Sequence, residues 1–332
     1  MGSSHNLKTL YRISLYSSVV MAGMHIATAQ TASNDIHVKQ WTAASSADTS
    51  TAKAAPTIKV DVNLVLVPVT VTDEMDRLIT GLEKDNFQVF EDKRLQAVQH
   101  LSSIDAPVSI GVIFDSSSSM SDKIDRAREA VRQFLRTANP DDELLLISLA
   151  DQPTELVDFT NNTEDIENGL LFATPKGSTA LLDAIYLGVA KMRTSKYSRK
   201  ALLIISDGGN NHSRYTERDV MRVVKESDIT IYSIGVYSYY FSSEEERLGP
   251  ELLSDISNIS GGRSFTIDTP NDLPEVATKI GVELRNQYLL GYRPDVAHND
   301  GKWHKIKVKV LPPKGLPRLQ LHARQGYYAH EE

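Results

Sequence analysis

The sequence predicts an α/β fold, in which a doubly wound, mostly parallel sheet is inserted into a small all-β sandwich domain. Between residues 106 and 286, nearly continuous apolar runs alternate with segments of helical periodicity, which is typical of a parallel sheet buried on both faces. Residues 58–104 and 287–328 instead show the period-two alternation of half-buried strands. Each flank is too small to be stable with ease on its own. We therefore expect the two flanks to pair into one β-domain that the α/β domain interrupts.

The composition is that of a globular protein and excludes several classes of function. Of the 332 residues, 41% are hydrophobic and 24% are charged, which excludes disorder of the whole chain. The net charge of −7, from 43 acidic and 36 basic residues without a long basic run, argues against nucleic acid as a partner. The absence of cysteine excludes disulfides, thiolate metal sites and a cysteine nucleophile. Any metal must then be held by oxygen or imidazole.

Residues 1–29 have the order of a secretory signal peptide. Lys8 and Arg12 precede an apolar stretch, and an A-x-A cleavage site follows it at 27–29. A disordered cytoplasmic leader is the alternative, because serines interrupt the apolar stretch. Residues 30–56 are rich in Ala, Ser and Thr, and we expect them to form a disordered linker. No later stretch offers the ~18 apolar residues of a membrane span. We therefore expect an exported protein, periplasmic or extracellular, with no transmembrane segment in the mature chain.

The β-domain is expected to contain short strands in both of its parts. Residues 58–72 alternate apolar and polar side chains and predict a half-buried strand. Shorter strand-like segments follow at 87–90, 97–98, 288–292, 306–310 and 319–321. A turn candidate, Asn299-Asp300-Gly301, lies before the strand at 306–310.

The α/β domain is expected to contain four buried strands and four helices. The apolar runs predict parallel strands at 108–114, 144–149, 201–205 and 229–234. Apolar residues at helical spacing predict helices at 124–135, 181–192, 250–258 and 271–285. Because doubly wound folds bind ligands beyond the carboxyl ends of their strands, the polar residues at those ends are the candidate site.

Polar side chains follow two of these strands and open one of the helices. Asp115, Ser117 and Ser119 come directly after the first buried strand and alternate along an extended turn, so that their oxygens can point the same way. Thr179 opens the second predicted helix, and Asp207 ends the third predicted strand. Two carboxylates and three hydroxyls, without sulfur or imidazole, suit Mg²⁺ or Mn²⁺ and suit Ca²⁺ less well. A serine-rich turn that only caps the following helix is the simpler alternative.

This pattern resembles the metal-ion-dependent adhesion site of a von Willebrand factor type A domain. The matching motifs are D-x-S-x-S from Asp115, the Thr179 of G-S-T-A-L-L-D-A and the Asp207 of I-S-D-G, in the family's order. The resemblance covers about residues 106–285. The flanking segments L-V-P-V-T-V-T-D, F-Q-V-F-E-D, Y-L-L-G-Y and R-Q-G-Y-Y are also similar to an exported group of von Willebrand A-related proteins in acidobacteria.

The resemblance implies a divalent-metal site in a non-catalytic, adhesion-type protein-binding module. Ser117, Ser119 and Thr179 would coordinate the ion through their hydroxyls, and Asp115 and Asp207 directly or through water. Two carboxylates only just neutralise a divalent ion, so the metal stays electrophilic enough to accept a carboxylate from a partner. We therefore expect Mg²⁺ or Mn²⁺ as the ion, and a partner protein with an exposed Asp or Glu side chain.

Further side chains are placed by the sequence on the metal-facing side of the sheet. Tyr239, Tyr240 and Phe241 follow the last predicted parallel strand and are candidate anchors for a partner. A lid that packs on the protein itself is the alternative for these aromatics. His212 is either a partner contact or a solvated loop residue. Asp183, one turn beyond the threonine, is interpreted as a helix-surface carboxylate rather than as a support for the metal ligands.

Two other classes of function remain as alternatives. A metal-dependent hydrolase would use Ser117 or Ser119 as nucleophile and His212 as base, but the sequence has no G-x-S-x-G elbow. A phosphatase with Asp115 as nucleophile would commonly have a second aspartate two positions on, where this chain has serine, and no nucleotide-binding G-x-x-x-x-G-K-[ST] motif occurs. The other class is a structural envelope protein that docks through its β-domain. We expect the chain not to be an enzyme.

Overall fold

The computed structural model describes residues 64–103, 105–236, 244–267, 269–295, 300–315 and 317–329. All of them belong to one compact unit, Lys59–Glu332. The predicted signal peptide at 1–29 and the predicted linker at 30–56 lie outside the described residues, as do the first six positions of the strand predicted at 58–72.

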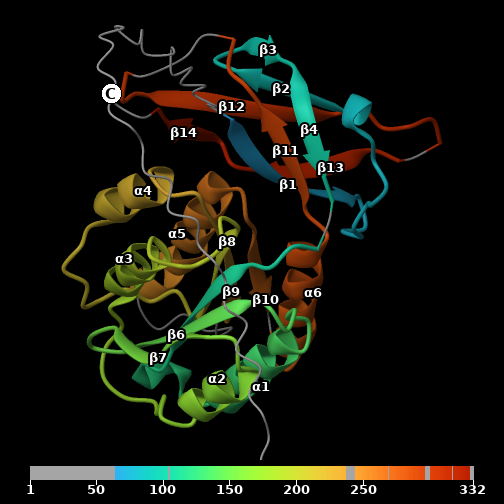
Figure 1. Cartoon of the computed structure of the whole chain (residues 1–332). Coiled ribbons are helices and arrows are strands. Elements are labelled where there is room, and N and C mark those ends of the chain that lie inside the picture. Colours follow the sequence, from blue (N-terminus) through green and yellow to red (C-terminus); the bar gives the residue numbers. More distant parts are fainter. Residues whose placement is uncertain are drawn as a thin grey trace, which may run out of the picture. The chain divides into compact units, whose positions relative to one another are not determined.

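The α/β part is built around a six-stranded sheet (Figure 1). Its strand order is β10 (Ser264–Ile267), β9 (Ile229–Val236), β8 (Lys200–Ser206), β5 (Ser109–Asp115), β6 (Glu143–Leu149) and β7 (Thr154–Thr160). All neighbours are parallel except β7, which runs antiparallel to β6. The chain leaves β5 for β6 on one side and returns to β8 on the other. The end of β5 is therefore the point where the strand order reverses, where doubly wound folds bind ligands.

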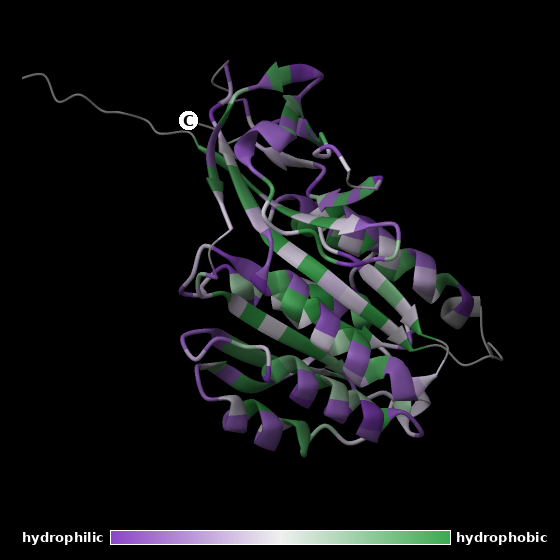
Figure 2. Ribbon diagram, turned by 90° about the vertical axis from the view of Figure 1, so that its right-hand side faces the viewer, coloured by the Kyte–Doolittle hydropathy of each residue, from purple (hydrophilic) through white to green (hydrophobic). Residues whose placement is uncertain are grey.

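Helices cover both faces of this sheet, and they bury their apolar sides on it. They are α1 (Ile124–Leu135), α2 (Thr163–Leu170), α3 (Leu181–Met192), α4 (Glu217–Lys225), α5 (Glu244–Ser260) and α6 (Leu273–Arg285). Buried residues of α1, α2 and α6 share one apolar cluster with the sheet, and those of α3, α4 and α5 share another. Figure 2 shows hydrophobic residues along the central strands and polar ones on the outer sides of the helices. The predicted fold class is thus confirmed for this part.

Some elements differ from the sequence prediction. The strands β7 and β10 and the helices α2 and α4 were not among the predicted elements, and α5 is longer than the predicted 250–258 because it continues through Pro250. The helix predicted at 271–285 starts as a short 3₁₀ turn, η3 (Pro270–Asp272), before α6. Among the described residues, no helix combines the length and the apolar character needed to cross a bilayer.

The flanking segments form a separate β region of two antiparallel sheets. One has the order β13 (Leu319–Ala323), β1 (Val65–Asp73), β11 (Tyr288–Tyr292) and β4 (Val98–Ser102). The other has the order β14 (Gly326–Tyr328), β12 (Trp303–Val310), β2 (Phe87–Glu91) and β3 (Arg94–Gln96), with the 3₁₀ turn η1 (Lys84–Asn86) before β2. Each sheet joins strands from both flanks, and the two sheets share one apolar core. The core includes Val69, Val89 and Tyr288.

The strand β1 departs from simple alternation, because both of its faces are covered at its carboxyl end. Val69 and Val71 face the β core, as the alternation predicts, but Thr70 and Thr72 on the other face are only 1% and 0% exposed. The Nε2 atom of Gln287 donates to Thr70 Oγ1 over 3.3 Å and to the hydroxyl of Tyr232 on β9 over 3.1 Å. A polar bridge thus joins β1 to the six-stranded sheet.

An ionic cluster also joins the two parts. Arg263, next to β10, pairs with Asp76 after β1 over 2.6 Å and with the carboxylate of Glu283 on α6, while Lys279 pairs with Asp76 from the same helix. Glu283 is fully buried. Burial raises the pKa of the Glu283 carboxyl to about 7, although the guanidinium of Arg263 works in the opposite direction.

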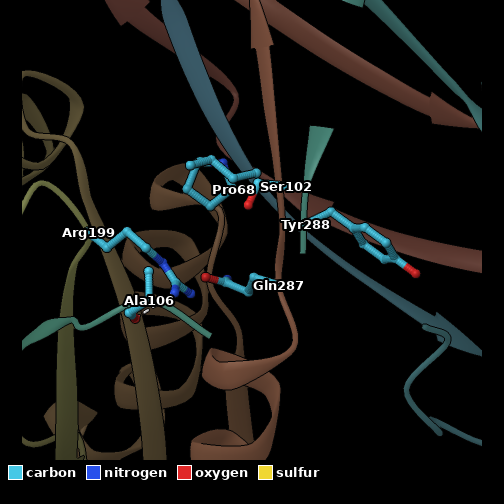
Figure 3. Close-up of a pocket in the computed structure, with 7 residues that line it drawn as sticks. Pro68, Ser102, Ala106, Arg199, Gln287 and Tyr288 are labelled. Carbon is cyan, nitrogen blue, oxygen red and sulfur yellow. Dashed lines mark hydrogen bonds between the residues drawn. The ribbon is translucent and has the colours of Figure 1, made fainter. Parts of the chain in front are cut away.

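A small cavity lies where β1 and β11 meet the α/β part (Figure 3). Figure 3 shows Arg199 and Gln287 reaching toward each other across it, while the ring of Tyr288 turns away. The Arg199 guanidinium donates to the carbonyls of Ala106 and Leu284 over 2.9 and 2.8 Å. A volume of about 40 Å³ has room for water but not for a larger ligand. We therefore interpret this cavity as a packing gap between the α/β part and the β region, and not as a ligand site.

Candidate metal centre

Asp115 is the central carboxylate of the candidate site. It ends β5, which lies between β6 and β8, and it is completely buried. Its Oδ1 atom accepts a hydrogen bond from the Ser117 backbone N–H over 2.9 Å, and its Oδ2 atom accepts one from Ser206 Oγ, at the end of β8, over 2.5 Å. The two strand ends are therefore held together through this side chain.

The serine hydroxyls of the loop after β5 point in two directions. Ser116 Oγ turns back to β6, where it lies 2.8 Å from Ser148 Oγ and donates to the Leu149 carbonyl over 3.0 Å. Ser117 Oγ and Ser119 Oγ instead lie 3.0 Å from each other. The chain then continues through the 3₁₀ turn η2 (Ser118–Met120) into α1. The two hydroxyls assigned to the metal are thus brought together, and that of Ser116 is directed to β6.

Thr179 is held in place by the loop that follows β8. Asn211 accepts from the Thr179 backbone N–H over 2.9 Å and donates its own N–H to the Thr179 carbonyl over 3.0 Å. The backbone N–H of His212 donates to the same carbonyl over 3.2 Å. A Cβ at Gly209 would lie 3.5 Å from Asp207 Oδ1 and 3.8 Å from Thr179 Oγ1. Both oxygens therefore border the same small space in front of Gly209.

The electrostatics of the site favour a bound cation. Burial and, to a smaller extent, the negative charge of Asp207 raise the pKa of the Asp115 carboxyl to about 6. Asp207 itself is only 3% exposed, and the Nζ atom of Lys123 lies 3.5 Å from its Oδ2. Two buried carboxylates with three hydroxyls form an oxygen-only donor set. These residues fit a hard divalent ion, which would relieve the repulsion between the carboxylates.

Four residues near the site were missed or misread from the sequence. Lys123 and Asn211 were not among the candidates, and neither was Asp151, which accepts from the Ser178 backbone N–H over 2.6 Å. That hydrogen bond, with a smaller contribution from the charge of His212, lowers the pKa of the Asp151 carboxyl. The interpretation of Asp183 as a helix-surface carboxylate is wrong. Asp183 is 8% exposed and accepts from the backbone N–H groups of residues 214 and 215 over 2.8 and 3.0 Å, so it fixes the loop after β8.

The candidate aromatic anchors Tyr239, Tyr240 and Phe241 lie outside the described residues. The described chain on either side of them borders the site. On β9, Gly235 is paired with Ser206, the residue before Asp207. On α5, a Cβ at Gly249 would lie 2.8 Å from the backbone of Gly208, the residue after Asp207.

A second group of potential ligand side chains lies in the β region. One atom each of Glu91, Asp92 and His304 fall within 4.8 Å of one another. His304 Nδ1 lies 2.8 Å from Asp92 Oδ2, and His304 Nε2 lies 3.1 Å from Asp300 Oδ1. Burial works to lower the pKa of His304, but the hydrogen bonds to the two aspartates outweigh it and raise the pKa. Both ring nitrogens of His304 are thus already engaged by the carboxylates of Asp92 and Asp300.

Proteins similar to this chain include two bacterial relatives whose printed names state no function and a solved von Willebrand factor type A structure. An "Uncharacterized protein" of Borreliella burgdorferi is 22% identical over 193 residues, which cover 51% of this chain and 55% of that protein. The chain thus spans about half the length of this relative. A "UPF0353 protein" of Mycolicibacterium gilvum is 24% identical over 241 residues, which cover 64% of this chain and 69% of that protein. The structure of a von Willebrand factor type A protein from Catenulispora acidiphila aligns with a TM-score of 0.48 and 13% identity, covering 82% of this chain and 75% of that one.

The family comparison gives the assignment. The profile of the von Willebrand factor type A domain matches residues 109–279, from the start of β5 into α6. This match takes in all five of the predicted metal ligands and the whole six-stranded sheet. Because it covers just over half of the sequence, the chain belongs to the von Willebrand factor type A domain family.

Proposed function

We propose that this protein is an exported, non-catalytic binding module that holds a divalent cation through Asp115, Ser117, Ser119, Thr179 and Asp207 and uses it to capture a carboxylate of a partner protein. The observation that carries the proposal is the pair of buried carboxylates, Asp115 and Asp207, at the point where the strand order reverses. Two buried carboxylates at one sheet edge repel each other and need a cation. Export is supported by the signal-like order of residues 1–29.

The charge of the ligand set supports a partner of this chemistry. The hydroxyls of Ser117, Ser119 and Thr179 contribute no charge, so the protein supplies only the two carboxylates to a divalent ion. When bound, the ion would supply an electrophilic position that accepts an additional oxygen donor. An exposed Asp or Glu of another protein is such a donor. The ligand set suits Mg²⁺ or Mn²⁺ better than Ca²⁺, which prefers more oxygen ligands.

The metal site can be tested by calorimetric titration with Mg²⁺ and Mn²⁺. We expect Asp115→Asn and Asp207→Asn to weaken metal binding by at least about tenfold, because each removes one of only two negative ligands. Ser118→Ala is the matched control, since Ser118 lies in the same loop but is exposed. It should keep the affinity of the wild type. Undiminished metal uptake by both aspartate variants would overturn the site.

Partner binding is expected to depend on the segment between β9 and α5 as well as on the ion. A single metal–carboxylate contact gives little specificity, so neighbouring apolar area has to contribute. We expect the triple change of Tyr239, Tyr240 and Phe241 to serine to weaken partner binding while leaving Mg²⁺ affinity intact. Thr179→Ala should weaken both.

The readout is a pull-down of envelope proteins with and without a chelator, followed by affinity measurements with the captured protein. If the triple variant binds that protein with full affinity, the segment is no partner anchor. If the capture is the same with chelator present, the role of the metal in partner binding is refuted.

A further inference from the structure

Lys123 places a positively charged side chain beside one of the proposed metal ligands. It lies at the end of the loop that follows Asp115 and carries Ser117 and Ser119, directly before α1. The residue is 6% exposed, and its ammonium donates to Asp207 Oδ2 over 3.5 Å. A buried ammonium is retained only where it is paired, because its desolvation is costly. For Lys123 that pairing partner is a carboxylate assigned to the metal.

The position of Lys123 changes the net charge of the metal-free site. Without a metal ion, Asp115 and Asp207 carry two negative charges and Lys123 carries one positive charge, which leaves the site with one net negative charge. A site without the lysine would be doubly negative and would attract a divalent ion more strongly. The same comparison explains how the domain can tolerate two buried carboxylates when no ion is bound, because one of them already has a counter-ion.

We propose that Lys123 is a tethered counter-ion that competes with the divalent metal for Asp207, lowers the metal affinity of the site and keeps the metal-free domain stable. This inference rests on the proposed metal site. The proposal implies that the sequence itself limits the metal affinity of the site. A positive charge fixed at the site lowers the affinity for a divalent ion by a factor of about ten or more, even with substantial dielectric screening.

The test compares Lys123→Met, which keeps the length and apolar stem of the side chain, with Lys123→Arg, which keeps the charge. Mn²⁺ affinity is measured by calorimetry, and thermal unfolding is followed in EDTA and in saturating Mn²⁺. Lys123→Met should bind Mn²⁺ about tenfold more tightly than the wild type, melt at a lower temperature in EDTA and gain more from Mn²⁺. Lys123→Arg should bind Mn²⁺ less tightly than Lys123→Met. A Lys123→Met variant that folds only with Mn²⁺ also supports the proposal.

Other results overturn the inference. A folded Lys123→Met with unchanged or weaker Mn²⁺ affinity would mean that the lysine has a structural role only, and so would a variant that stays unfolded in saturating Mn²⁺. Asp115→Asn, titrated in parallel, separates this failure from that of the site itself. If Asp115→Asn loses Mn²⁺ while Lys123→Met binds like the wild type, the metal site stands and the role of Lys123 falls. If Asp115→Asn binds Mn²⁺ undiminished, the proposed site fails first.

Discussion

Deleting residues 288–332 is expected to leave β1 without either of its neighbours and to unfold the N-terminal part of the β region. β1 pairs with β11 from Val65↔Tyr292 to Val69↔Tyr288, and with β13 from Val69↔Ala323 to Asp73↔Leu319. Both partners lie within the deleted segment. The deletion also removes the fully buried Tyr288, Leu290 and Tyr292 from the core. Each such side chain stabilises the fold by about 1.5–3 kcal/mol, so the remaining strands cannot keep a core.

Hydrogen exchange measures this effect strand by strand. In the truncated chain, the amides of β1 and β2 should exchange at the rate of an unfolded peptide. The amides of β5 provide the internal control, because both strands that pair with β5, namely β6 and β8, lie outside the deleted segment. They should stay protected. Unchanged protection of β1 after the deletion would show that the N-terminal flank is stable without the C-terminal one.

Replacing Arg263 with methionine is expected to destabilise the protein by about 3–5 kcal/mol at pH 8, because it leaves Glu283 buried without its counter-ion. Glu283 is fully buried and Arg263 is 11% exposed at its side chain. The matched control is Arg132→Met. Arg132 and Glu129 also form an ion pair, but their side chains are 36% and 34% exposed. Loss of this exposed ion pair should lower the free energy of unfolding by less than about 1 kcal/mol.

The effect of Arg263→Met should depend on pH. The pKa of Glu283 is raised to about 7 in the folded protein, against an ordinary value of 4.5. Between these two values the folded state binds more protons than the unfolded state, so the stability from this group falls as the pH rises. Removing the guanidinium raises the folded-state pKa further and extends the window upward. Urea unfolding should therefore show a smaller loss at pH 5, where Glu283 is neutral, than at pH 8. Equal losses at both values would contradict this account.

The parts of the fold that could be predicted from the sequence are those in which local pattern decides the structure. The runs around β5, β6, β8 and β9 are apolar at nearly every position, because both faces of these strands are buried. The edge strand β7 is half exposed along Thr154–Thr160 and shows no such run. The helix α4 did leave a signal, since Thr216 and Asp219 form a capping box ahead of apolar residues.

The residues of the candidate site also fall into those that the local sequence predicts and those that it does not. The spacing of Asp115, Ser117 and Ser119 is local, and the strand order places Asp207 at the same sheet edge. The position of Lys123 is not local. Its burial depends on how the start of α1 packs against the end of β8, 84 residues further along the chain. The contact between Asn211 and Thr179 likewise joins residues 32 positions apart. No periodicity in either segment reports such a contact.

The pairing of β1 with strands from the far end of the chain has a consequence for the order of events during synthesis. Val69 and its partner Tyr288 lie roughly 220 positions apart. At ordinary elongation rates of about 5–20 residues per second, β1 leaves the ribosome some 10 to 40 seconds before a neighbour exists for it. During this interval a valine-rich segment presents two unpaired backbone edges to every other chain nearby. The β region can form only after the α/β domain has been synthesised. Until then, only a low concentration of chains or chaperones can keep β1 from pairing with other chains.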